Sequence, residues 1–174
     1  MVMVMTPVHM RHVDVQLQLI GLVISVHVAG MYALSPLVGM AADRFGRRVV
    51  IGAGVAILAL ACVLGAAAPA DDVPRLGVAL FLLGLGWSCT LIGGSTLLVE
   101  DVAPGDRPAV QGASDLVMNV AGAVGGIVAG IVVAEASYAV LCLAALVPVV
   151  SLGAYVAISL RRTPAQPQGG SSPV

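Results

Sequence analysis

Five long apolar runs constrain this chain more than any other feature of its sequence. Four of them contain no charged residue and one contains a single acid, Asp115; they cover residues 19–42, 49–70, 76–99, 108–134 and 136–160. An α-helix needs about 20 apolar residues to cross a bilayer. Backbone polar groups in lipid must pair within a helix or a closed barrel, and these runs lack the alternation of barrel strands. We therefore expect an all-α membrane protein with five transmembrane helices.

The composition argues against the soluble classes. Only 10% of the residues are charged and 59% are hydrophobic, whereas soluble domains carry about a quarter charged residues. A net charge of −1 gives no reason to expect nucleic acid as a partner. The three cysteines lie in separate runs, so we interpret them as packing residues rather than as a metal site. Because the sequence contains no catalytic triad or phosphate-binding glycine loop, we expect neither an enzyme nor a cofactor.

The two ends of the chain differ from the runs between them. Residues 1–7 are apolar but reach only about a third of the way across a bilayer, so we interpret them as the end of a truncated helix. The polar residues at 9–14 predict a loop. The five-helix bundle is then expected within residues 8–162. Residues 163–174 are rich in proline, glycine, serine and glutamine, which predicts a disordered tail.

The arginines predict the orientation of the spans. All eight basic residues are arginine, and cytoplasmic loops carry an excess of basic residues. Two of them, Arg11 and Arg75, fall on one side of the predicted membrane. The other six fall on the opposite side: Arg44, Arg47, Arg48, Arg107, Arg161 and Arg162. We expect a multi-pass protein of the plasma membrane with a cytoplasmic C-terminus.

The densest group of charges lies between the first two runs, at residues 39–48, which we call the motif segment. Its sequence is GMAADRFGRR. Gly39 would let a neighbouring backbone approach closely, and Gly46 would permit a tight turn. Asp43 could cap an adjacent helix, and Arg44 could pair with an acid at another helix end. The simpler alternative is a cytoplasmic loop whose arginines only set the orientation.

The motif segment resembles motif A of the major facilitator superfamily, which has the pattern G-x-x-x-D-R-x-G-R-R. The matching positions are Gly39, Asp43, Arg44, Gly46, Arg47 and Arg48. In that family the motif lies between helices two and three and, in weaker form, between helices eight and nine. One full run precedes it here and four follow before the chain stops. This position favours helices eight to twelve, the C-terminal half, with the resemblance covering roughly residues 1–162.

The resemblance implies a function and a set of partners. It implies a secondary transporter for efflux or uptake of a small molecule by alternating access, with a missing N-terminal half and with protons as a candidate coupling ion. It also implies that the motif arginine, Arg44, pairs with Glu100 or Asp101 at the end of the third run. The alternative from a different class is a stand-alone small membrane protein that scaffolds or regulates a partner.

Four residues inside the runs are candidates for a cavity or for ion coupling. Asp115 lies about 10 Å in from Pro108, and acids at such depth usually face a cavity or a partner. Asn119 follows it at i+4. The other two candidates are His27 and Trp87. Each has a structural alternative, as a rim acid for Asp115 and as packing for the other two.

The glycines of the fourth run predict a close helix–helix contact. They follow a GxxxGxxxG pattern at Gly122, Gly126 and Gly130. Small residues at this spacing let two helix backbones approach each other. We expect similar packing from the glycines of the third run at Gly84, Gly86, Gly93 and Gly94.

Overall fold

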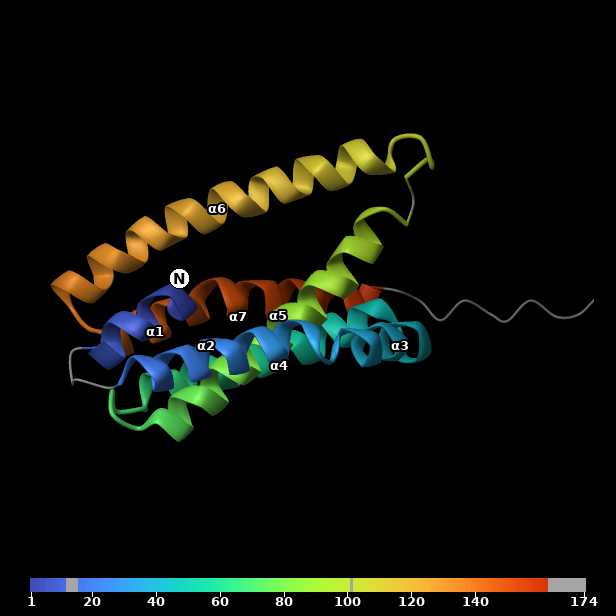
Figure 1. Ribbon diagram of the computed structural model, residues 1–174. Coiled ribbons are helices and arrows are strands. Elements are labelled where there is room, and N and C mark those ends of the chain that lie inside the picture. Colours follow the sequence, from blue (N-terminus) through green and yellow to red (C-terminus); the bar gives the residue numbers. More distant parts are fainter. Residues whose placement is uncertain (12–15, 101, 163–174) are drawn as a thin grey trace, which may run out of the picture.

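The computed structural model of the protein describes residues 1–11, 16–100 and 102–162, and in these ranges it contains α-helices and no strands. The helices run antiparallel in a bundle, with α6 set apart along one side (Figure 1). Their bounds are α1 Val2–Arg11, α2 Leu17–Tyr32, α3 Ser35–Phe45, α4 Arg47–Ala66, α5 Val73–Leu98, α6 Arg107–Glu135 and α7 Tyr138–Arg162.

The five predicted spans are present in the described chain. Helices α2 and α3 together form the first, over Leu17–Phe45, and α4, α5, α6 and α7 form the others. Each is long and apolar enough to cross a bilayer. The ends lie within a few residues of the predicted ones, so the all-α membrane fold expected from the apolar runs is confirmed.

The first span is interrupted, which the sequence analysis did not predict. The chain turns at Ala33 and Leu34, between α2 and α3. Pro36 explains the break, because proline has no N–H for the helical hydrogen bond and its ring clashes with the preceding turn. The Ser35 hydroxyl donates to the Met31 carbonyl at 2.9 Å, which satisfies one backbone acceptor left by the break.

Helix α1 continues past the predicted end at Pro7 to Arg11, so residues 8–11 are helical rather than part of a loop. The predicted boundary was wrong because packing outweighs the hydrogen bond that Pro7 removes. Val2, Thr6 and Met10 recur every four residues and are all buried against the bundle. The rest of the expected loop, residues 12–14, lies outside the described residues.

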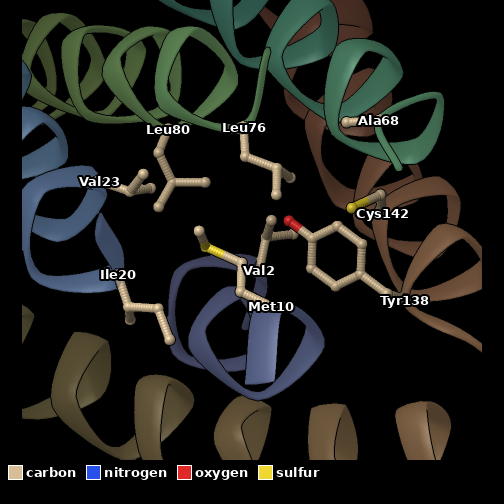
Figure 2. Close-up of a cluster of buried hydrophobic side chains, with 9 residues drawn as sticks. All are labelled: Val2, Met10, Ile20, Val23, Ala68, Leu76, Leu80, Tyr138 and Cys142. Carbon is tan, nitrogen blue, oxygen red and sulfur yellow. The ribbon is translucent and has the colours of Figure 1, made fainter. Parts of the chain in front are cut away.

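The buried face of α1 packs into a hydrophobic cluster. This cluster joins α1 to α2, α4, α5 and α7 and to the turn after α4. Figure 2 shows Val2 and Met10 pointing into the cluster beside Tyr138 of α7. Thr6 donates its hydroxyl to the Val2 carbonyl at 3.0 Å. The Tyr138 hydroxyl lies 2.9 Å from the Thr6 hydroxyl oxygen and, because the Thr6 proton is used on Val2, Tyr138 donates to Thr6. This buried pair ties α1 to the start of α7.

Helix α5 is the centre of the bundle and packs through its glycines. A Cβ at Gly84 would overlap the His27 carbonyl of α2. On the α4 side, a Cβ at Gly86 would lie 2.9 Å from the Gly54 carbonyl oxygen, and one at Gly93 would lie 3.1 Å from the Arg47 carbonyl oxygen. The predicted close packing of the third run is therefore confirmed at Gly84, Gly86 and Gly93. At Gly94 a Cβ would meet nothing within 4 Å.

Candidate functional site

The motif segment forms a tight helix–turn–helix, as expected from its glycine. Helix α3 ends at Phe45 and α4 begins at Arg47, so Gly46 alone connects them. Gly46 has φ 90° and ψ 143°, a backbone conformation that residues with a Cβ rarely adopt. Its N–H donates to the Ala42 carbonyl at 3.1 Å and its carbonyl accepts from Val50 at 3.3 Å. The turn thereby places consecutive arginines on the first turn of α4.

Glu100 pairs with Arg47. The Nη1 atom of Arg47 lies 2.6 Å from Oε1 of Glu100. The arginine side chain is 31% exposed and the glutamate side chain 49% exposed, so the pair is partly shielded from solvent. Because Arg47 begins α4 and Glu100 follows α5, the pair ties the motif turn to the end of the central helix.

Arg44 was expected to pair with Glu100 or Asp101, but Glu100 pairs with Arg47. Arg44 belongs to the last turn of α3, and its guanidinium carbon lies 5.6 Å from the centre of the Phe45 ring. Arg47 takes the place on Glu100 because α4, not α3, runs closely along α5. The alternative acid, Asp101, lies outside the described residues.

A cleft of about 610 Å³ lies beside the motif turn. Its lining combines Asp43, Arg47, Arg48 and Glu100 with the apolar side chains of Phe45 and Leu97. A second cleft of about 500 Å³ lies between α4, α5 and α7 and shares Arg48 and Glu100 with the first. The end of α5 therefore separates two hollows, and Glu100 lines both of them.

Gly39 has no close neighbour in the described chain. A Cβ at this position would meet nothing within 4 Å, so the close backbone approach that we expected there is absent. The capping role of Asp43 stays a prediction.

His27 is held by the bundle. Its side chain is 4% exposed, and Nδ1 lies 2.7 Å from the Leu80 carbonyl oxygen of α5. Because a carbonyl can only accept, Nδ1 carries the proton and donates it. This bond joins α2 to α5 beside the Gly84 contact, so the packing alternative explains His27 without a coupling role.

Trp87 is half-buried on α5, and its carbonyl accepts from the Thr90 hydroxyl at 2.9 Å. None of the cavities described here has Trp87 among its lining residues. Its cavity role stays a prediction.

Asp115 lines a cavity of about 230 Å³ between α5 and α6. Nε2 of Gln111, one turn earlier, donates to Asp115 Oδ1 at 3.2 Å. Asn119 instead turns its amide back to the Asp115 carbonyl at 2.7 Å. The two predicted neighbours are therefore joined through the backbone, and Gln111 is the residue that contacts the carboxylate.

Sequence reasoning missed Gln111 and Ser114 as members of this cavity, although a signal was present. Gln111, Ser114, Asp115 and Met118 follow one another at i, i+3, i+4 and i+7, the spacing of one helix face. A polar stripe at that spacing within an apolar run indicates a face turned away from lipid.

The glycine stripe of α6 does not pack within the described chain. A Cβ at Gly122, Gly126 or Gly130 would meet nothing within 4 Å. Within the described chain this stripe therefore makes no close contact, and its role in helix packing stays a prediction. Figure 1 shows the physical reason, since α6 lies apart from α2 and α4, and Ala129 is its buried residue.

Comparisons with known proteins give a consistent result. Residues 1–173 match the family model of the Major Facilitator Superfamily. Two relatives from Bacillus subtilis (strain 168) are the uncharacterized MFS-type transporters YddS and YdeG. YddS is 44% identical over 80% of this chain and 32% of its own length, and YdeG is 42% identical over 82% of this chain and 33% of its own length.

A more distant relative is the riboflavin transporter RfnT of Brucella anthropi. It is 32% identical over 53% of this chain and 23% of its own length. The chain thus spans about a third of the length of the first two relatives. No solved structure matches the chain significantly.

Proposed function

Because this chain belongs to the Major Facilitator Superfamily, we propose that it forms the C-terminal part of a secondary transporter that moves a small molecule across the plasma membrane by alternating access. Its partners are the lipid bilayer and an N-terminal half of the same transporter. The six-to-two distribution of arginines supports a cytoplasmic position for the motif segment and the C-terminus. A free-standing regulatory membrane protein remains the competing function, and a transport assay separates the two.

The Arg47–Glu100 pair carries the proposal. It joins the start of α4 to the end of α5 at the expected cytoplasmic face. In alternating access two bundles rock around a midplane site, and a contact made in one state only shifts the balance between the states. We propose that the Arg47–Glu100 pair is such a contact and that it stabilises one of the two states at the cytoplasmic side.

The test is a double-mutant cycle in cells that express the complete transporter. Arg47→Ala and Glu100→Ala are each expected to change the transport rate by about two- to fivefold, since partly exposed pairs contribute up to about 1 kcal/mol. The double mutant should be no worse than the stronger single mutant, because the second change removes a partner that is already lost.

Arg44→Ala with Glu100→Ala is the matched control cycle. Arg44 belongs to the same motif segment but lies over Phe45, so its effect should add to that of Glu100→Ala. If the effects of Arg47→Ala and Glu100→Ala on the transport rate are fully additive, the proposed role of the Arg47–Glu100 pair is wrong. If the complete protein moves no small molecule in any background, the transport function itself is wrong.

A further inference from the structure

Polar and apolar residues together line the cavity between α5 and α6. Five of its residues are polar and are contributed by both helices: Thr90, Ser95, Gln111, Ser114 and Asp115. Leucine and methionine side chains complete the lining. Polar groups are costly inside a membrane span and seldom gather there without a role.

The hydrogen bonds made by these lining residues leave several of their oxygen atoms able to accept from a ligand. The Thr90 hydroxyl donates to carbonyls of its own helix, at 3.1 Å to Gly86 and 2.9 Å to Trp87. The Ser95 hydroxyl donates to the Ile92 carbonyl at 3.3 Å. A hydroxyl has one proton, so both oxygens can only accept from a ligand. Gln111 uses its amide nitrogen on Asp115 and keeps its carbonyl oxygen.

The charged side chain that lines the cavity is negative. Asp115 supplies a carboxylate, and the described residues that line the cavity include no arginine. Within a membrane span the field of such a carboxylate is screened less than in water. The cavity therefore favours a ligand that brings a positive charge and several hydrogen-bond donors.

We propose that this cavity binds the protonated amine of the molecule that the transporter moves. The inference rests on the proposed function and names the substrate class, an organic ammonium ion. A primary ammonium group has three N–H donors and no acceptor, which matches a carboxylate surrounded by hydroxyl and amide oxygens. A volume of about 230 Å³ suits the charged end of a ligand, since sites for whole drug-sized molecules occupy about 300–1,000 Å³.

The test measures binding to the 174-residue chain in nanodiscs of zwitterionic lipid. The probe is benzylammonium, followed by calorimetry and by the fluorescence of Trp87, the single tryptophan, which lies one turn before Thr90. We expect saturable binding above that of empty nanodiscs. Benzyltrimethylammonium, which has the charge but no N–H donor, should bind about tenfold or more weakly.

Asp115→Asn should weaken benzylammonium binding by about tenfold or more, because it removes a charge-assisted hydrogen bond. Asp106→Asn is the matched control, since Asp106 precedes the same helix and is not part of the lining. Thr90→Val should weaken binding a fewfold. Thr96→Val should not, because Thr96 bonds to its own helix in the same way but lies outside the cavity.

Three results would overturn the proposal: equal binding by Asp115→Asn, equal affinity for benzyltrimethylammonium, or displacement of benzylammonium by sodium but not by choline at the same ionic strength. The last would identify an alkali-ion site. These outcomes are separate from the fate of the proposed function. Transport by the complete protein with no benzylammonium binding contradicts this inference alone, and binding without transport contradicts the transport function alone.

Discussion

Gly46 holds a backbone conformation that other residues adopt only under strain. Its φ of 90° lets α3 and α4 join through one residue, and this geometry brings Arg47 to Glu100. At the residue scale, the motif segment therefore depends on a glycine that supplies conformation and an arginine that supplies charge. The neighbouring Gly39 has neither a positive φ nor a close contact.

Gly46→Ala is expected to destabilise the chain by about 1–3 kcal/mol, the cost of a side chain at such a φ. Gly39→Ala is the control within the same segment. It should be neutral or stabilising by up to about 1 kcal/mol, because alanine favours the helix interior and nothing lies in its way. Unfolding of the two variants in detergent by added SDS measures the difference. Equal stability would contradict the conformational argument.

At the element scale, α5 is held by backbone-to-backbone contacts with its two neighbours. Gly84 lies against the backbone of α2, where the His27 side chain also bonds to the Leu80 carbonyl. Gly86 lies against α4. In lipid the hydrophobic effect does not draw helices together, so such close packing is the main source of their association. Helix α6 lacks contacts of this kind in the described chain.

Gly84→Ala is expected to cost about 1–3 kcal/mol, because the added carbon meets a carbonyl oxygen that cannot move without its helix. Gly94→Ala, ten residues later on the same helix, meets open space and should cost nothing. The same SDS titration compares them. A loss of stability in both variants would show that the helix responds to any alanine rather than to the α2 contact.

At the scale of the whole molecule, the described helices leave one span largely uncovered. Ala129 is the buried residue of α6, and its glycine stripe faces open space. In the two-bundle transporter that we propose, such a face would be available to the other half.

Replacing Gly122, Gly126 and Gly130 together by alanine should leave the stability of this chain unchanged or slightly higher, since no atom lies within 4 Å of the added carbons. In the complete transporter the same triple variant should lower transport, because the other half would then meet three new methyl groups. Stability of the isolated chain and transport by the complete protein are the paired measurements. Unchanged transport would contradict the idea that the other half packs there.

The sequence by itself determined the number of spans, the tight turn at Gly46 and the match to the family's motif. These features are local, because a run of apolar residues long enough for a bilayer must form a helix to satisfy its own backbone. The interruption of the first span before Pro36 is also a local feature, and the proline that causes it could have been recognised in the sequence. The extension of α1 beyond Pro7 could not be predicted from the sequence, because it depends on the burial of Thr6 and Met10 against the bundle.

Only the tertiary structure decided which charges and glycines meet. The resemblance implied Arg44 as the partner of Glu100 or Asp101, and the closeness of α4 to α5 selects Arg47 for Glu100. Gly84, Gly86 and Gly93 of α5 pack closely. The stripe Gly122, Gly126 and Gly130 of α6 does not, although its spacing is typical of close contact. Such contacts join residues far apart in the chain, so they depend on helix placement, which the spacing of residues along one helix does not specify.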